Sequence, residues 1–327
     1  MLVGVNTHFN YNDGKYNWSN DFTPTVEKVK WLGVHEVRDH APVPGKWWVE
    51  EPYKHLRDAG IKLAIMTGGP IAETVANARS ILPNASIARF EGPNEPNNSG
   101  WTGDAVQYMR DLKAAVLPVP VAGICSWPEI GAPSDFMNLH PYSRGAGRAD
   151  PKLAIAANLQ SQIHAEDAAA RLHGYTAPSK FVISEIGFGT KDSNEYGAAL
   201  TEEQQANYLI ASLEYAKQIG CAAFDVYELI DDRPNSLGMG LWSFHDDPRQ
   251  MKPKLAATAV RDWIARQAAP APAPAPVTPS PVPTPPAPTV PAGELRTRLD
   301  KARLEVNGLK NAASRALYAI DKAIDGL

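Results

Sequence analysis

The sequence has little cysteine. Only two cysteines, Cys125 and Cys221, occur in 327 residues, and each lies in a separate apolar segment. Two cysteines cannot build a disulfide framework, and these two form no CxxC pattern typical of a metal or redox site. We therefore expect both to be small buried side chains, with a single disulfide between them as the alternative.

The sequence also lacks a strong charge of either sign. Its formal net charge is −4 and its isoelectric point is about 6.1. These values argue against nucleic acid or an anionic membrane surface as a partner, and they favour a neutral substrate.

No long apolar run is present either. No stretch approaches the ~20 apolar residues of a membrane helix, so we expect no membrane insertion. The N-terminus, MLVGVNTHFN, lacks the basic start, apolar middle and small-residue cleavage site of a secretion signal. The localisation stays unknown: the protein acts where it is made, leaves by a route such as a virion or lysis, or has lost a leader.

Proline is abundant near the C-terminus. Between 270 and 291, 11 of 22 residues are proline and none is charged, a composition that cannot pack a core. We predict a domain at 1–266, a Pro/Ala-rich linker at 267–291, which would extend on the order of 70 Å, and a helical segment at 292–327.

The C-terminal segment has an apolar stripe at helical spacing, which predicts self-association or docking on a partner. Asn307-Gly308 leaves open a division into a helical hairpin. The stripe consists of Leu295, Leu299, Val306, Leu309, Ala313, Leu317, Ile320, Ile324 and Leu327.

Short apolar runs alternate with helical stretches over 1–266, which predicts a parallel sheet covered by helices. Eight strands in this length fit a (β/α)8 barrel; a doubly wound open sheet is the alternative, although its usual glycine-rich first turn is missing. The predicted strands are 2–6, 35–38, 62–66, 87–91, 119–124, 136–140, 181–185 and 223–228. The predicted helices are 24–31, 52–59, 71–82, 103–116, 154–173, 202–219 and 254–266.

Acidic residues end two of the predicted strands. Asn94-Glu95 follows the fourth strand between two prolines, and Glu185 ends the otherwise apolar seventh strand. The active site of such a barrel lies at the C-terminal ends of its strands, so both carboxylates face one mouth. Glycoside hydrolysis needs two carboxyl groups, one protonated and one ionised, and these two glutamates are our candidates.

The pattern resembles clan A of the glycoside hydrolases, in which strand four ends in Asn-Glu-Pro and strand seven in a second glutamate. The resemblance covers about residues 1–266 and looks closest to the family 39 type of barrel, with family 5-like features. It implies that Glu95 is the acid/base, that Glu185 is the nucleophile and that Asn94 contacts the sugar 2-hydroxyl.

Two further features carry the same resemblance. His140-Pro141-Tyr142 matches the His-x-Tyr of strand six, and Arg38 matches an arginine that ends strand two near the nucleophile. From the residues themselves, we expect Arg38 to favour the ionised form of Glu185 and Tyr142 to hold Glu185 by a hydrogen bond. Glu95 has no fixed positive partner in this interpretation and can stay protonated as the acid.

The pattern departs from the clan after strand eight. Tyr227-Glu228 stands where the clan commonly has the tryptophan that floors the sugar site, and Trp242 in the following loop is our candidate for that floor. Tyr227 itself, and Asn6 and His8 at the end of strand one, are further candidates for substrate contact.

The resulting prediction is a retaining hydrolase that cleaves β-glycosidic bonds in a polysaccharide or oligosaccharide, with endo action favoured and no cofactor. A metal site from His140, Glu185 and Asp231 lacks any HxH, HExxH or facial-triad spacing, so we expect no metal. Two alternatives stay open: a non-catalytic carbohydrate-binding barrel, and a virion or cell-surface assembly protein with a barrel head.

Overall fold

The computed structural model describes residues 1–11, 16, 21–99, 103–125, 129–142, 151–193, 198–231 and 237–268, without the side chains of 99 and 151–154. Eight parallel strands form one sheet in the order β5-β4-β3-β2-β1-β8-β7-β6. A parallel bridge between Ala122 and Phe136 joins the two ends of this order. The predicted (β/α)8 barrel is therefore confirmed.

The strands form where short apolar runs are bounded by turns, as the sequence predicts. Three of them, β1, β3 and β4, have the predicted bounds. The strands are β1 (Leu2–Asn6), β2 (Glu36–His40), β3 (Lys62–Met66), β4 (Ile87–Glu91), β5 (Val121–Ala122), β6 (Met137–Leu139), β7 (Phe181–Ile186) and β8 (Ala223–Val226).

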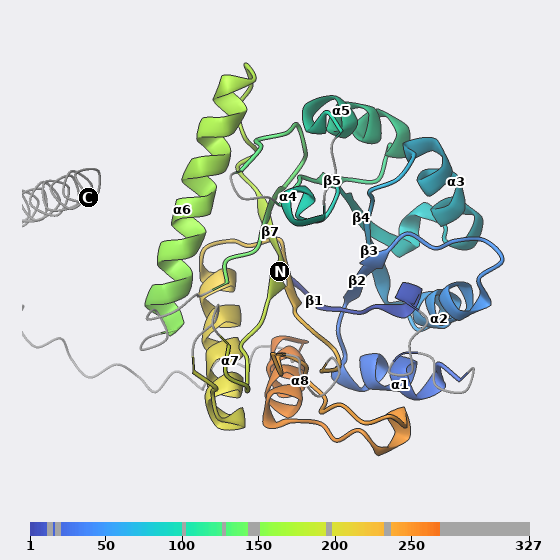
Figure 1. The fold of residues 1–327 in the computed structure, drawn as a ribbon, viewed down its shortest axis with the longest axis vertical. Coiled ribbons are helices and arrows are strands. Elements are labelled where there is room, and N and C mark those ends of the chain that lie inside the picture. The colour runs from blue at the N-terminus through green and yellow to red at the C-terminus, as the bar shows by residue number, and fades with distance from the viewer. Residues whose placement is uncertain are drawn as a thin grey trace, which may run out of the picture. The chain divides into compact units, whose positions relative to one another are not determined.

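Helices cover the strands on the outside, as Figure 1 shows. They bury one face against the sheet, and α7 begins with a capping box in which Thr201 and Gln204 bond each other's backbone. The helices are α1 (Thr23–Leu32), α2 (Trp47–Asp58), α3 (Ile71–Ile81), α4 (Pro96–Ser99), α5 (Ala105–Val116), α6 (Pro151–Leu172), α7 (Glu202–Gln218) and α8 (Leu255–Ala268).

Two parts of the fold differ from the prediction. Helix α2 begins at Trp47 rather than at Pro52, which lies inside the helix; proline favours a helix start, but it does not require one. Strands β5 and β6 are short, with two and three residues, against the six and five predicted. The described parts of their connection, 123–125 and 129–136, contain no helix, and none was predicted there.

Charged side chains fill part of the barrel interior below the strand ends. Arg89 is buried and forms ion pairs with Glu36, Glu91 and Asp225 from β2, β4 and β8. A Cβ on Gly4 of β1 would collide with the Asp225 carboxylate, so glycine is required where β1 passes this cluster. The cluster forms a rigid layer directly beneath the site described next.

The described segments end with α8, which runs two residues past the predicted domain boundary. Residues 269–327, with the predicted linker and C-terminal helix, lie outside the described residues. Cys125 and Cys221 are both buried and unbridged, as expected. Within the described residues, no helix combines the length and apolar character needed to span a bilayer.

Candidate active site

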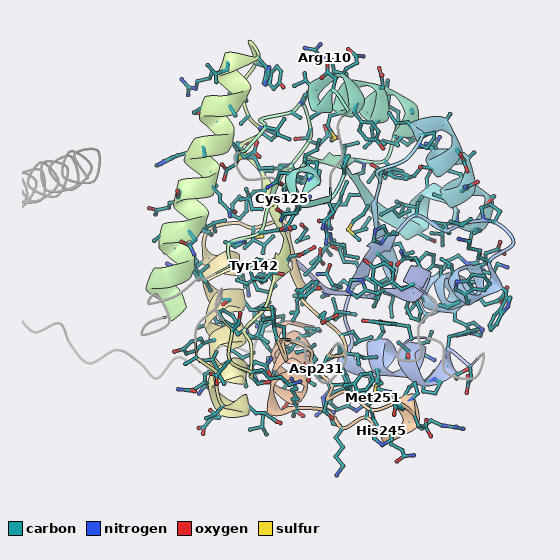
Figure 2. The ribbon with its side chains drawn as sticks, in the orientation of Figure 1. Arg110, Cys125, Tyr142, Asp231, His245 and Met251 are labelled. Atoms are coloured by element: carbon teal, nitrogen blue, oxygen red, sulfur yellow. The ribbon has the colours of Figure 1, made fainter. Side chains whose placement is uncertain are left out.

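Polar side chains gather where β1, β2, β4, β6 and β7 end. Figure 2 shows one of them, Tyr142, between α6 and the central strands. Most of the residues in this cluster are candidates that the sequence indicated.

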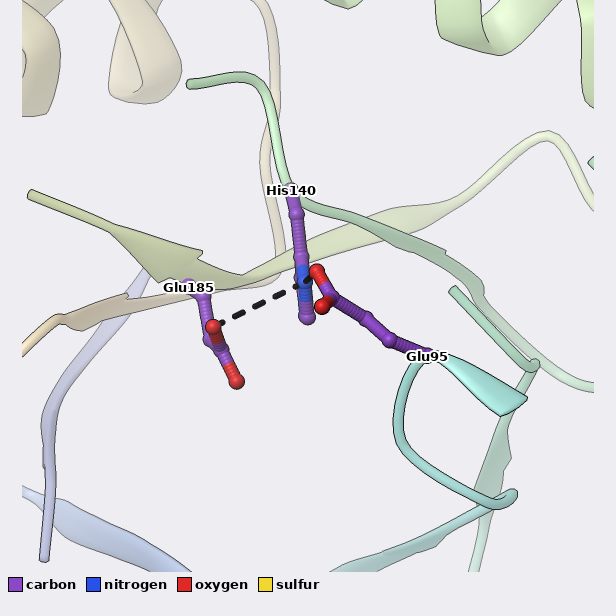
Figure 3. A group of neighbouring side chains, drawn as sticks. All are labelled: Glu95, His140 and Glu185. Carbon is purple, nitrogen blue, oxygen red and sulfur yellow. Dashed lines mark hydrogen bonds and ion pairs between the residues drawn. The ribbon is translucent and has the colours of Figure 1, made fainter. Parts of the chain in front are cut away.

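The two glutamates lie close together. Glu185 is part of β7 and its side chain is 10% exposed, whereas Glu95 lies in the turn after β4 and its side chain is 32% exposed. One carboxylate oxygen of each and Nδ1 of His140 all lie within 4.8 Å of one another. Figure 3 shows the His140 ring between the two carboxylates.

The backbone at Glu95 has φ = 39°, a left-handed conformation that few residues other than glycine adopt. Such strained positions concentrate at functional sites, where the surrounding structure maintains them. Two features hold this turn. Prolines lie on either side of Asn94-Glu95, and the Asn98 N–H donates to the Glu95 carbonyl at 2.8 Å.

Arg38 is the centre of the cluster, as the resemblance implies. Its guanidinium donates to Glu185 Oε1 at 2.5 Å, to Glu91 Oε2 at 2.7 Å and to the side-chain oxygens of Asn6 and Asn94 at 2.8 and 2.7 Å. Burial lowers the pKa of Arg38, but the charges of Glu91 and Glu185 outweigh burial and raise it. Arg38 therefore stays charged and fixes Glu185 in place.

The His-Pro-Tyr segment after β6 reaches both glutamates. Tyr142 donates its hydroxyl to Glu185 Oε2 at 3.0 Å, as predicted. His140 Nδ1 lies 2.9 Å from Glu95 Oε1, and Nε2 lies 2.9 Å from Ser184 Oγ. One short segment of the chain thus holds both carboxylates.

The partners of His140 decide its protonation. Ser184 donates its hydroxyl to Asn138 Oδ1, so it accepts from His140 Nε2, while Nδ1 faces the Glu95 carboxylate. Because the pKa of Glu95 is lowered, its carboxylate is an acceptor, and both ring nitrogens then act as donors, which only the imidazolium can do. Burial lowers the pKa of His140, but the acidic side chains beside it, including Cys125 and Glu185, raise it well above its ordinary value.

Glu95 does have a fixed positive partner, contrary to our expectation. The hydrogen bond from His140 lowers the pKa of Glu95 to about 2, against the opposing effect of burial. The expectation was wrong because the sequence placed His140 near the sugar and gave no sign that it faces Glu95. In the resting site the proton is on His140, next to the residue expected to act as the acid.

Asn6, His8 and Tyr227 also reach the mouth. Asn6 is 1% exposed and donates to the Ser184 carbonyl at 2.9 Å, so it supports the cluster from below. The His8 ring lies 6.0 Å from the Tyr227 ring, which lies 6.3 Å from that of Tyr142. His8 and Tyr227 therefore form an aromatic wall beside Tyr142.

The structure does not bring Trp242 to this cluster. Its ring packs edge-on against Trp31 of α1 at 5.5 Å, and its backbone bridges to Ile230 and Pro253. The loop after β8 folds back toward α1 and α8, and Trp242 is 4% exposed there. Of the aromatic residues considered for the floor of the sugar site, Tyr227 is the one at the mouth.

Four contributors were missed by sequence reasoning. Ser184 bonds His140 and Glu91 bonds Arg38, Asn138 accepts the Ser184 hydroxyl, and Cys125 lies beside His140. The available signal was a polar residue within an apolar strand run, at 91, 138 and 184. Burial raises the pKa of Cys125, as do the charges of Glu95 and Glu185, while His140 opposes them. Nothing in the sequence separates this residue from an ordinary core cysteine.

A cavity of about 590 Å³ adjoins the cluster at Asn94. The loops after β2, β3 and β4 line it, and its polar side chains include Asn10, Lys46, Glu73 and Asn77. Its volume falls within the range of ~300–1,000 Å³ typical of small-molecule sites.

Asp231 does not join His140 and Glu185 in a metal-binding group. Its carboxylate lies 2.7 Å from Lys254 Nζ and accepts from Gly240 N–H. Among the described residues, Glu95, His140 and Glu185 are spaced so that they could hold an ion, but the direct His140–Glu95 bond already satisfies two of them. The prediction that the site needs no metal stays a prediction.

No protein-family model matches the sequence, and no curated protein matches it. Solved structures do match the fold. A β-glucosidase from Exiguobacterium marinum is 13% identical with a TM-score of 0.57, over 83% of this chain and 99% of that one.

Two further matches are larger proteins. A β-glucuronidase from Ruminococcus gnavus in complex with D-glucaro-d-lactam is 16% identical with a TM-score of 0.54, over 80% of this chain and 49% of that one. A β-D-glucuronidase from Dictyoglomus thermophilum is 13% identical with a TM-score of 0.57, over 81% and 50%. This chain thus spans about half the length of the β-glucuronidases, and the similarities show the barrel fold.

Proposed function

We propose that this chain is a retaining glycoside hydrolase that cleaves β-glycosidic bonds, with Glu185 as nucleophile and Glu95 as acid/base. The observation that carries the proposal is the pair of carboxylates at the ends of β4 and β7, with oxygens within 4.8 Å. Retaining enzymes place their carboxyl groups about 5–5.5 Å apart, and inverting enzymes about 6.5–9.5 Å apart. The separation supports retention.

Glu185 has the environment of a nucleophile. Arg38 and Tyr142 each donate to one of its oxygens, which favours the ionised form and aims the carboxylate. In the first step a Glu185 oxygen forms a bond to the anomeric carbon while the bond to the leaving oxygen breaks. Water then attacks the same carbon, and the bond to Glu185 breaks.

Glu95 serves as acid and base through His140. His140 Nδ1, which carries the proton, lies 2.9 Å from Glu95 Oε1. Transfer of this proton to Glu95 lets Glu95 pass it on to the leaving oxygen. In the second step Glu95 takes a proton from the attacking water, and His140 regains its own. The greater exposure of Glu95, 32% against 10% for Glu185, suits a group that must reach leaving group and water.

The cavity beside Asn94 supports an oligosaccharide or polysaccharide substrate. It provides room for sugar units beyond the one at the glutamates, and its mixed polar lining suits neutral hydroxyl groups. The matching solved structures are named as β-glucuronidases and a β-glucosidase, which favours a β-linked glycoside. Endo action, and the closer kinship to family 39 or family 5-like barrels, stay parts of this proposal.

The first experiment is hydrolysis of a panel of defined glycans, followed by mass analysis of the products. Wild-type protein should cleave at least one β-glycan, and Glu185→Gln and Glu95→Gln should each abolish most of that activity. Glu203→Gln, an exposed carboxylate on α7, is the matched control and should keep full activity.

The alternative, a non-catalytic carbohydrate-binding barrel, predicts a different result in this experiment. Binding of a glycan without cleavage, unchanged by Glu185→Gln, would favour it. An assembly role for residues 270–327 is compatible with either activity of the barrel.

A further inference from the structure

Helix α6 presents three polar side chains to the segment that holds the two glutamates. Asn158, Gln162 and Glu166 are spaced four residues apart, so they lie on one face of the helix. Asn158 Nδ2 donates to the carbonyl of Tyr142 at 2.8 Å, and Gln162 Nε2 donates to the carbonyl of His140 at 2.9 Å. The helix thus bonds the backbone of both residues that contact the catalytic carboxylates.

These two bonds matter because the segment lies beyond the strand ladder, where the Tyr142 N–H bonds the His140 carbonyl at 2.8 Å and α6 adds a donor to each of the two carbonyls. Strand β6 ends at Leu139, and its ladder with β7 pairs Leu139 with Ile183 and goes no further. A carbonyl that leaves a ladder needs another donor when water is excluded. The amides of Asn158 and Gln162 supply that donor, so they set the height of His140 and Tyr142 above the strand ends.

Glu166 extends the same row by one turn. It is 6% exposed, and its Oε1 has no hydrogen-bond partner among the described residues; nor has Oε1 of Gln162. Gly131 N–H bonds the Glu166 carboxyl from the segment between β5 and β6. These two buried oxygens lie on adjacent turns of one helix face, and a proton on Glu166 gives the pair a donor.

The charged surroundings of Glu166 favour that proton. Burial, and then the charge of Glu129, raise the pKa of Glu166 to about 8. Tyr175 faces it from beyond the end of α6, and Arg110 of α5 lies near Tyr175. At neutral pH Glu166 is therefore a neutral donor.

We propose that Asn158 and Gln162 are positioning residues for the Glu95–Glu185 pair, and that the Glu166 carboxyl, one turn further along α6, locks Gln162 in place. The inference rests on the proposed function, because the measured effect is on glycoside turnover. Ionised Glu166 repels the Gln162 oxygen, the amide turns, and His140 loses its anchor.

The first test removes each donor. Gln162→Met and Asn158→Leu keep the shape and lose the bond, and they should lower kcat on the order of 10- to 100-fold while KM changes little, since misplacement by ~1 Å costs about that much. Gln160→Met, an exposed glutamine on the same helix, should match wild type. Wild-type kcat in both donor variants, with native thermal unfolding, would overturn the positioning role.

The second test replaces the titrating group. Glu166→Gln carries an amide that donates at every pH, so it should keep wild-type kcat at neutral pH and shift the alkaline fall of kcat to higher pH. A pH profile that superimposes on that of wild type would overturn the lock.

A third readout needs no activity and so separates this inference from the proposed function. Because the pKa of Glu166 is raised in the folded protein, its contribution to stability is full below about pH 4.5 and is lost as pH rises through about 8. The thermal midpoint of wild type should fall over that window relative to Glu166→Gln. If the thermal midpoints of wild type and Glu166→Gln depend equally on pH, or if added Ca²⁺ raises the midpoint of wild type only, then no proton fills the site and the lock is overturned. This readout holds even in a protein without glycosidase activity.

Discussion

Replacing Arg38 with methionine tests how the site is held together. Arg38 is 1% exposed, and its loss leaves the carboxylates of Glu91 and Glu185 buried without this partner. Breaking a buried ion pair by removing one side costs about 3–5 kcal/mol. Burial raises the pKa of Glu91, but Arg38 and Arg89 together lower it from 4.5 to about 2, and Arg38→Met removes one of these two partners.

Arg38→Met should therefore lower the free energy of unfolding by about 3–5 kcal/mol and the thermal midpoint by roughly 6–20 °C. Urea denaturation followed by circular dichroism at pH 7 measures the first quantity. The Glu91 contribution is present above about pH 4.5 and lost as pH falls through about 2, so the difference from wild type should shrink over that range. Turnover should fall on the order of 100-fold, because Glu185 is no longer fixed.

A surface arginine provides the control. Arg171 pairs with Asp167 at 2.7 Å but its side chain is 72% exposed, so Arg171→Met should change stability by less than about 0.5 kcal/mol. If Arg38→Met is as stable as this control, Arg38 does not carry the buried network and the reasoning fails.

Three further predictions concern His140, Gly4 and the proline tract. His140→Gln should raise the pKa of Glu95 from about 2 toward its ordinary value, because the His140 hydrogen bond is the largest cause of the shift; carbon NMR of labelled glutamate checks it, and an unmoved resonance would contradict the pairing. Gly4→Ala should destabilise the barrel by several kcal/mol, since its Cβ would displace the Asp225 carboxylate from Arg89; a wild-type thermal midpoint would show that the interior can adjust. A chain ending at residue 269, the end of the first compact unit, should retain turnover on a soluble glycan, and a loss of folding would refute the spacer role of the proline tract.

Much of the fold could be predicted because local pattern and tertiary structure agree. Strands such as β3 and β4 are apolar runs closed by turn residues, and both have the predicted bounds. Short β5 and β6 were predicted too long, since apolar character at 119–124 and 136–140 continues past the ladder bonds. Periodicity reports burial, and it does not report where pairing ends.

For the site, the sequence identified residues better than it identified their contacts. The rule that strand ends meet at one mouth brought Arg38, Glu95 and Glu185 together. It could not show that His140 faces Glu95, because that depends on the side-chain direction at the end of a three-residue strand. Trp242 was misjudged for a related reason: the path of a long loop is not encoded in strand periodicity, and this loop returns to α1.

Azide rescue distinguishes the nucleophile from the acid/base, the roles proposed for Glu185 and Glu95. The substrate is an aryl glycoside whose leaving group departs without protonation, of the sugar identified by the glycan panel. Glu95→Ala should form the glycosyl-enzyme from it, and added azide should then restore turnover and give a glycosyl azide of retained configuration. Rescue of Glu185→Ala with an inverted azide, and none of Glu95→Ala, would contradict the assignment.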